Sequence, residues 1–503
     1  MGKHRATAAS RSADHLMVVS LRRRSRGALM VSTALQAVVL SVLGLLGTAF
    51  AQLPANTLPT GGSVIGGKAS ISRSGNALQV TQTTNNAAVN WNSFSIGSAA
   101  RVHFAEPNAQ SMVINRVVGP DPSVIAGRLT SNGQVVLVNQ SGVVFARGAM
   151  VDVQSLIVSA PGITEANAKA GRLVFDQPAR AGAVVANHGT ITVGQTGLAA
   201  LVAPRVVNSG VIRAQMGRVV LAGAEAHTID LYGDGLLSID VTRQVGTAPV
   251  GRDGQSATTL VTNTGIIQAD GGTVLLTASA IDGIVQNLVS AGGTISAATV
   301  AGQAGRVIIG GTGGSVVVQG TIAARGEMAG TMGGQIQVNT PGSNVTLAAG
   351  ARLDASGRAG GGTIAVGTTL ARARGGPGTM VPTARNVTIE RGATLAADAT
   401  RRGNGGNVTV LSAGGTTRFR GDISGRGGDE GGNGGFVELS GDHVTLGGRV
   451  HLGAPMGKGG TVLLDPTDLD ITLPARAIQP APERRASTLR TSSTSPPKAP
   501  WCW

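Results

Sequence analysis

The residues of this 503-residue chain that could do chemistry are few and scattered. Asp465, Asp468 and Asp470 form the densest group of carboxylates, and glycoside hydrolysis requires two carboxyl groups roughly 5–10 Å apart on one wall. The order Asp465-Pro466-Thr467-Asp468, however, is typical of a solvated turn. We therefore interpret these aspartates as part of a turn, and we keep a secreted polysaccharide-degrading enzyme as an alternative function.

Other motifs for catalysis or metal binding are incomplete. The seven histidines include no His-Glu-x-x-His sequence, which would have indicated zinc. Gly453–Lys458 approximates a phosphate-binding loop, but it has one residue too few between its glycines and has Gly459 where Ser or Thr is required. No Gly-x-Ser-x-Gly nucleophile elbow is present. The sequence therefore predicts no enzyme activity, no catalytic residues, no metal and no cofactor.

One tripeptide suggests receptor binding. Arg420-Gly421-Asp422 matches the sequence that integrins bind, but Arg and Gly are both common in this chain. It stands between Phe419 and Ile423, where a corner between two strands is expected. We interpret it as that corner.

The composition is typical of a structural chain of stacked strands. Gly accounts for 77 of the 503 residues, hydrophobic residues for 42%, charged residues for 13% and aromatic residues for 2%. The apolar content is too high for disorder, and Val, Ile, Leu and Ala fit the narrow cores of stacked strands. Much of the net charge of +15 lies in the first 51 residues and after residue 475. Without a basic face or stacking aromatics, the chain is not expected to bind nucleic acid.

Two short phrases recur along the chain and predict its fold. The motif Asn-x-Gly-x-Ile begins at Asn187, Asn208 and Asn263. A glycine followed by alternating aliphatic residues opens at Gly305, Gly334, Gly362, Gly406, Gly435 and Gly460. A repeat of 20–50 residues with a two-residue period inside it indicates stacked strands joined by sharp Asn and Gly corners. We expect an all-β chain that forms a right-handed parallel β-helix, an elongated rod with almost no helix over residues 67–472.

The N-terminal 51 residues have the features of an export signal. A basic segment at Arg22–Arg26 precedes an apolar run from Ala28 to Gln52. Ala49-Phe50-Ala51 is a small-residue cleavage site, so cleavage before Gln52 is expected. A membrane anchor is the alternative, and the start of translation is either Met1 or Met17. Because Cys502 is the single cysteine, no intrachain disulfide can form.

From Gly67 to Ala160 the sequence resembles a known family, the N-terminal secretion domain of filamentous haemagglutinin-type two-partner secretion exoproteins. The matching segments are Asn90-Trp91, Ser93-Phe94-Ser95-Ile96-Gly97, Val102-x-Phe104, Asn115-Arg116-Val117, Pro122-Ser123-x-Ile125-x-Gly127, Asn132-Gly133-Gln134-Val135 and Asn139-x-x-Gly142-Val143-x-Phe145. The resemblance implies export through an outer-membrane barrel transporter with periplasmic domains. That transporter would recognise the N-terminal domain as the secretion signal, the address of the exported chain.

The resemblance implies turn and transporter-recognition roles for Asn115, Arg116, Asn132, Asn139 and Gly142. The family usually has Asn-Pro-Asn-Gly where this chain has Asn139-Gln140-Ser141-Gly142, and the lost proline should loosen the turn. Asn139 can still accept a hydrogen bond from the backbone two residues on, and Gly142 can take a positive φ. We expect this turn to stack the runs before and after it in one core.

The expected organisation has four parts. Residues 1–51 are a cleaved signal peptide, 52–250 the secretion (haemagglutination activity) domain, 251–475 the β-helical rod, and 476–503 a disordered polar tail, for which a truncated gene is one explanation. The expected function is that of a secreted or surface-exposed bacterial adhesin whose ligand lies on a host or neighbouring cell. A purely structural surface or matrix protein is the second alternative.

Overall fold

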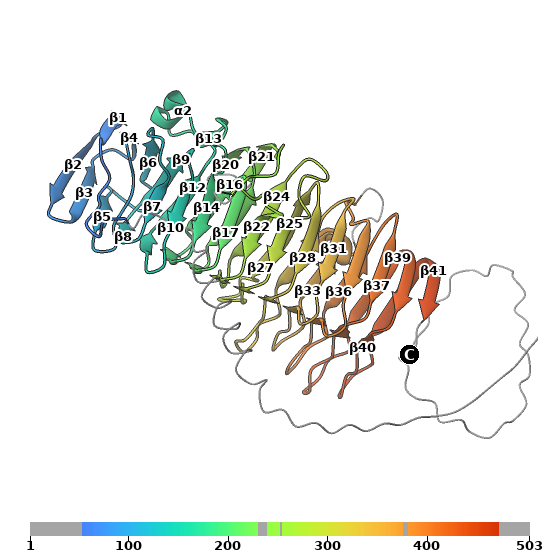
Figure 1. Cartoon of the computed structure of the whole chain (residues 1–503). Helices are drawn as coiled ribbons and strands as arrows, with labels where there is room; N and C mark the ends of the chain where they lie inside the picture. Colours follow the sequence, from blue (N-terminus) through green and yellow to red (C-terminus); the bar gives the residue numbers. More distant parts are fainter. Residues whose placement is uncertain (1–52, 230–238, 252–253, 376–380, 472–503) are drawn as a thin grey trace, which may run out of the picture. The chain divides into compact units, whose positions relative to one another are not determined.

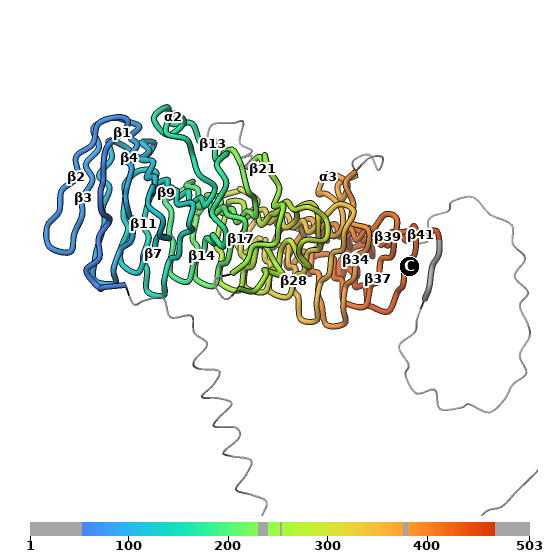
Figure 2. The backbone as a smooth tube through the Cα atoms, turned by 45° about the horizontal axis from the view of Figure 1, so that its top comes forward, coloured from blue at the N-terminus to red at the C-terminus, as the bar shows by residue number. Residues whose placement is uncertain are grey.

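The computed structural model describes residues 53–471 except 230–238, 252–253 and 376–380. The predicted signal peptide, with Ala49, Ala51 and Gln52, and the predicted tail 476–503 lie outside the described residues. The described residues from Leu53 to Ile471 belong to one compact unit. Within it the backbone winds in successive coils, each of which contributes strands to up to three parallel faces (Figures 1 and 2).

The first face is a parallel ladder in which each strand hydrogen-bonds to the equivalent strands of the coils before and after it. Its strands are β4 (Asn86–Trp91), β6 (Met112–Val117), β9 (Gln134–Asn139), β12 (Ser155–Ser159), β16 (Leu198–Ala203), β19 (Arg218–Gly223), β24 (Thr273–Ser279), β27 (Arg306–Thr312), β30 (Gln335–Asn339), β33 (Thr363–Val366), β36 (Asn407–Leu411), β39 (Phe436–Leu446) and β41 (Thr461–Ile471).

The second face follows the first around each coil and is also parallel. It consists of the second halves of β39 and β41 together with β7 (Ser123–Ile125), β10 (Val143–Phe145), β14 (Val184–Asn187), β17 (Arg205–Asn208), β22 (Thr259–Asn263), β25 (Asn287–Ala291), β28 (Ser315–Val318), β31 (Asn344–Leu347), β34 (Asn386–Ile389) and β37 (Thr416–Phe419).

The third face completes the coil. It contains β3 (Ala77–Gln82), β5 (Arg101–Ala105), β8 (Arg128–Ser131), β11 (Met150–Val153), β15 (Thr190–Val193), β18 (Val211–Ala214), β23 (Ile266–Gln268), β26 (Thr294–Ser296), β29 (Thr321–Ala323), β32 (Arg352–Asp354), β35 (Thr394–Ala396), β38 (Asp422–Ser424) and β40 (Arg449–His451).

The antiparallel elements lie at the start of the stack and outside it. β1 (Ser63–Gly66) pairs antiparallel with β4, and β2 (Ala69–Ser74) with β3. The remaining elements are a three-stranded antiparallel sheet of β13 (Val174–Phe175), β20 (Ala226–Ile229) and β21 (Ile239–Arg243), and the short helices α2 (Glu165–Lys169) and α3 (Leu370–Ala373). The prediction of an all-β parallel β-helix is confirmed.

The core is the apolar interior of the coils. In β24 every second residue is buried, from Val274 through Leu276 to Ala278. These residues pack in register on Val307, Ile309 and Gly311 of the next coil. The two-residue period therefore has the predicted consequence, because one side of each strand faces the interior.

A ladder of buried asparagines explains the first repeated phrase. Asn187, Asn208 and Asn263 end β14, β17 and β22 in adjacent coils and are fully buried. Asn187 Nδ2 donates to Asn208 Oδ1 at 2.8 Å, and Asn208 Nδ2 donates to Asn263 Oδ1 at 2.7 Å. Each amide thus satisfies the amide of the next coil at the same corner.

A column of glycines explains the second phrase. Gly334, Gly362 and Gly406 precede β30, β33 and β36, where one coil passes directly over the next. A Cβ atom on Gly362 would lie 2.1 Å from the Gly334 carbonyl oxygen, and one on Gly406 would lie 2.1 Å from the Gly362 carbonyl oxygen. Glycine is therefore required here by the close approach of two backbones.

This column predicts an asymmetry between two glycine substitutions. In Gly362→Ala the new methyl group forces adjacent coils apart, so we expect the free energy of unfolding to fall by about 1–3 kcal/mol. In Gly453→Ala, where a Cβ has no atom within 4 Å, we expect a change within about 0.5 kcal/mol. Urea denaturation of the two purified variants measures both values. Equal stability of the two variants would contradict this account of the column.

Candidate functional site

The N-terminal coils carry a second apolar cluster on the outside of the first face. Its strand residues, which alternate with those of the core, include Ile114, Val136, Val138, Ile157 and Val202. A flap formed by residues 160–183 and β20 covers them and contributes Ile163, Ala168, Leu173, Phe175 and Ile229. β9, β12 and β16 are therefore buried on both sides, which sequence analysis missed. The signal was present, because their apolar runs are continuous where half-buried strands alternate.

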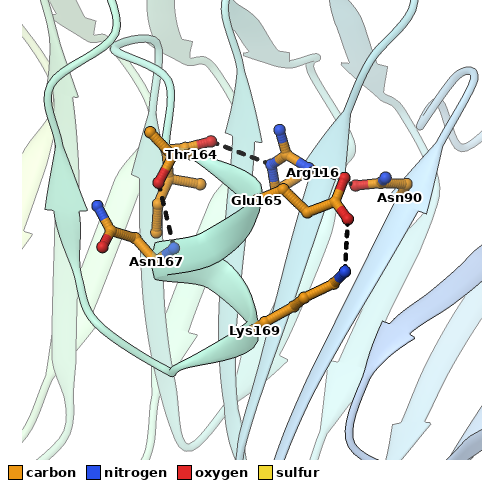
Figure 3. Close-up of polar contacts among 7 residues, drawn as sticks. Asn90, Arg116, Thr164, Glu165, Asn167 and Lys169 are labelled. Atoms are coloured by element: carbon orange, nitrogen blue, oxygen red, sulfur yellow. Dashed lines mark hydrogen bonds and ion pairs between the residues drawn. The ribbon is translucent and has the colours of Figure 1, made fainter.

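Arg116 fastens the flap to the coils (Figure 3). It lies on the outer side of β6, where its Nε donates to the carbonyl oxygen of Ile163 at 3.1 Å. Its Nη1 donates to Asn90 Oδ1 at 2.8 Å and lies 3.9 Å from Glu165 Oε2. Burial lowers the pKa of the Arg116 guanidinium, and the nearby Glu165 carboxylate partly opposes this shift.

Helix α2 is built to present Glu165 to Arg116. Thr164 caps its N-terminus and accepts a hydrogen bond from the Asn167 backbone at 3.1 Å. Glu165 also forms a 2.6 Å ion pair with Lys169 one turn along the helix, and this contact holds the pKa of the Glu165 carboxyl below its usual range (Figure 3). The predicted recognition residue Arg116 is thus an internal contact of the folded domain.

Removing the Arg116 side chain should loosen the flap without unfolding the coils. In Arg116→Ala the contacts to Ile163, Asn90 and Glu165 are lost, and a hydrogen bond from a charged group contributes about 1.5–3 kcal/mol. We expect faster backbone hydrogen exchange over residues 160–175, measured by mass spectrometry. Lys169→Ala removes only an exposed ion pair and should have a small effect. Unchanged protection of the flap in Arg116→Ala would refute the fastening role.

Asn115 points the opposite way from Arg116, into the core. It is fully buried, its Oδ1 accepts a 2.9 Å hydrogen bond from Trp91 Nε1, and its Nδ2 donates to the Val136 carbonyl oxygen at 3.3 Å. It therefore joins three successive coils through a buried indole and a backbone carbonyl.

The Asn132 side chain bonds to the backbone of the preceding coil at the corner between the third and first faces. Its Oδ1 accepts from the Glu106 backbone N–H at 2.8 Å, and its Nδ2 donates to the Glu106 carbonyl oxygen at 2.7 Å. The side-chain amide thereby takes the place of a peptide group and ties the corner of one coil to the next.

The Asn139–Gly142 turn has the geometry that the sequence predicts. Asn139 is buried, and its Oδ1 accepts from the Ser141 backbone N–H at 2.9 Å. Its Nδ2 donates at 3.0 Å to both the Asp121 carbonyl oxygen and Ser123 Oγ. Gly142 has a φ of 97°, and a Cβ there would lie 2.5 Å from the Val184 carbonyl oxygen. The inward residues before and after the turn, Val135, Leu137, Val143 and Phe145, share one core as expected.

Side-chain contacts stabilise this turn where the family's proline is missing. Ser141 Oγ donates to the Pro120 carbonyl oxygen at 2.6 Å and contacts Arg180 Nη1 at 2.8 Å. Gln140 Nε2 donates to the Pro178 carbonyl oxygen at 2.8 Å. The expected loosening is therefore offset by contacts that a proline and an asparagine at these positions would not make in the same way. A surface hollow of about 440 Å³ lies beside the turn, lined in part by Pro120, Ser141 and Arg180.

The remaining candidates from the sequence do not form a site among the described residues. The interpretation of Asp465–Asp468 as a turn is wrong, because these residues lie within strand β41 and pair in register with β39. Asp465 is exposed there, and only the backbone of Asp468 and Asp470 is described. Asp422 accepts from Arg449 Nε at 2.7 Å at the start of β38, so Arg420-Gly421-Asp422 is the corner that its surroundings predict. Over the described ranges no group of three or more His, Cys, Asp or Glu side chains could hold a metal. In the same part of the chain no helix is long and apolar enough to cross a membrane.

A stack of parallel coils with a covered first face and a buried Asn–Gly turn places this protein in the class of parallel β-helices. A family model of the TPS (two-partner secretion) secretion domain matches residues 52–324. The chain therefore belongs to this family and is a protein of the extracellular space or cell surface. The match runs past residue 250, and the proposed domain boundary there stays a prediction.

Individual relatives agree with this assignment. The crystal structure of the HMW1 secretion domain from Haemophilus influenzae matches with a TM-score of 0.63 and 26% identity, covering 82% of this chain and 100% of that chain. A heme/hemopexin-binding protein of Haemophilus influenzae is 31% identical over 221 residues, which are 43% of this chain and 23% of the relative. A second protein of that name and species is 38% identical over 82 residues, 16% of this chain and 9% of the relative. The chain thus spans less than a quarter of the length of each of these two heme/hemopexin-binding proteins.

Proposed function

We propose that this chain is the exported member of a two-partner secretion system and acts as an adhesin. Its secretion domain is the address that an outer-membrane barrel transporter reads with its periplasmic domains. The later coils present a surface that binds a ligand on a host or neighbouring cell. The observation that carries the first half of this proposal is the family match over residues 52–324, which includes the whole Asn139–Gly142 region.

The burial of the proposed recognition residues supports an order of events. Asn115 and Asn139 are 0% and 1% exposed in the folded coils, so a partner protein has no access to their side chains there. The transporter therefore reads them in the unfolded chain, and the coils close afterwards. Stacking on the nearest neighbour lets folding propagate from coil to coil, and the single cysteine of the sequence leaves no intrachain disulfide to hinder passage.

The proposal predicts that the Asn139–Gly142 turn matters for export. Asn139→Ile removes the amide that bonds Asp121, Ser123 and Ser141, and Gly142→Val forces a β-branched residue into a positive φ, which costs about 1–3 kcal/mol. We expect both variants to be secreted less than the wild type when expressed with the transporter. Secreted and periplasmic protein are compared by quantitative immunoblotting.

A change at an exposed residue elsewhere in the domain serves as the control. Asp152 is exposed on β11, so Asp152→Asn should be secreted as the wild type. Wild-type secretion of both turn variants would show that the address is written elsewhere, with Asn115-Arg116-Val117 as the next segment to test.

Export also predicts the start of the mature chain. We expect secreted protein to begin at Gln52, since Ala49 and Ala51 provide the small residues that signal peptidase requires. Intact-mass analysis of secreted protein measures this directly. A mass that includes the apolar segment before Gln52 would contradict cleavage at this site.

The adhesin role is tested separately from export. Purified secreted protein should bind to intact cells in a saturable manner, and unlabelled protein should compete for the sites. Binding that does not saturate would favour the structural alternative, a matrix or surface-layer protein.

A further inference from the structure

A buried carboxyl group stands at the corner that Asn132 closes. Glu106 follows β5, where the chain turns from the third face to the first, and it is 7% exposed. Its Oε1 accepts a hydrogen bond from Ser131 Oγ at 2.7 Å. Its Oε2 is buried and has no partner among the described residues. A carboxylate in this position would leave a buried charged oxygen without a donor from the described residues.

The surroundings of Glu106 hold no compensating charge. The coil before it (77–100), the segment after it (107–115) and the corner and strands of the next coil (129–146) contain no Asp, Glu, Lys, Arg or His. The charged and titratable residues of the adjacent strands are Arg101 and His103 on β5 and Arg128 on β8, and all three are exposed. His103 Nδ1 contacts Thr130 Oγ1 at 2.9 Å on that outer side. No ion pair is therefore available to stabilise an ionised Glu106.

A second buried oxygen at the same corner also lacks a donor. In the register, Thr81 pairs with Ala105, so Gln82 stands one coil before Glu106 at the same corner position. Gln82 is 4% exposed, and its Oε1 is buried without a partner while its Nε2 donates to the Thr84 carbonyl oxygen. Two buried acceptor oxygens without donors among the described residues therefore occupy equivalent corner positions of adjacent coils.

The coil on the other side leaves room for the carboxyl group. A Cβ atom on Gly133 would lie 2.4 Å from the Glu106 carboxyl carbon. Gly133 N–H donates to Ser131 Oγ at 3.0 Å, which orients that hydroxyl toward Glu106 Oε1. The corner is therefore shaped around the Glu106 side chain.

We propose that Glu106 is a proton-binding site, held as a neutral carboxylic acid that keeps the corners of the first coils closed and opens them when its proton is lost. No transfer to another group is involved, since the proton is exchanged with solvent. The device is independent of the transporter and would act in the folded protein outside the cell.

The direction of the pH dependence follows from burial. Burial raises the pKa of Glu106 to about 8 from an ordinary value of 4.5, and the Ser131 hydrogen bond lowers it by a smaller amount. The folded state thus holds a proton that the unfolded state has released between these two values. The stability that Glu106 contributes is complete below pH 4.5, falls as pH rises, and is lost once pH passes about 8.

The experiment compares the wild-type chain with Glu106→Gln, which keeps the size of the side chain and supplies a permanent donor. Urea unfolding is measured from pH 5 to pH 9. At each pH the unfolding constant of the wild type is divided by that of Glu106→Gln, so that the effects of other titrating groups cancel. We expect this ratio to rise by up to about tenfold per pH unit between pH 5 and pH 8 and then to level off. Asp152→Asn, which removes an exposed carboxylate, should follow the wild type.

A second measurement reports the proton directly. The infrared C=O stretch of a protonated carboxylic acid should be present in folded wild type at pH 7 and absent in Glu106→Gln. A difference spectrum without this band, or a ratio of unfolding constants that does not change with pH, would overturn the proposal. If Glu106→Gln does not fold, loss of the band in wild-type protein between pH 7 and pH 9.5 still tests it.

Discussion

The structure depends on one constraint, the close stacking of each coil on the coil before it. Every strand in the three faces hydrogen-bonds to the equivalent strand of its neighbours, so a residue at one register position meets the same position of the next coil. The side chain at each position must therefore pack against the side chain at the equivalent position of the next coil. Aliphatic residues do this inside, asparagines do it at one corner through the Asn187–Asn208–Asn263 ladder, and at the tightest corner only glycine leaves enough space.

The secretion domain adds a second layer to this plan. Its first face is apolar on the outside as well, and the flap covers that side with Ile163, Leu173 and Phe175. The later coils have a smaller cover, in which α3 packs Leu370 and Ala373 on Ala365. Because Arg116 fastens the larger flap, the folded domain depends on contacts that cross the coil repeat. We infer that this cover, more than the coil itself, distinguishes the domain from the stack that follows.

Local physics made the fold predictable, and long-range contacts limited the prediction of the site. The two-residue period and the Asn–Gly corners depend only on residues that are close together in the sequence. The parallel β-helix and the Asn139 turn could therefore be predicted from it. Arg116, in contrast, bonds Ile163, which lies 47 residues away, and nothing near Arg116 indicates that partner. Glu106 was missed for the same reason, since its burial is created by Ser131 and Gly133 of the next coil.

On the proposed export route, the buried motif residues have a role in two states of the chain. In the folded domain Asn115 bonds Trp91 and Val136, and Asn139 bonds Asp121, Ser123 and Ser141, so all their polar atoms are committed inside. In an extended chain the same amides are free to bind a transporter. On the proposed route, closing the coils therefore removes the address from the transporter as each coil emerges. The hydrogen bonds that stabilise the fold would then also disfavour re-entry, and direction would follow from folding without a separate energy source.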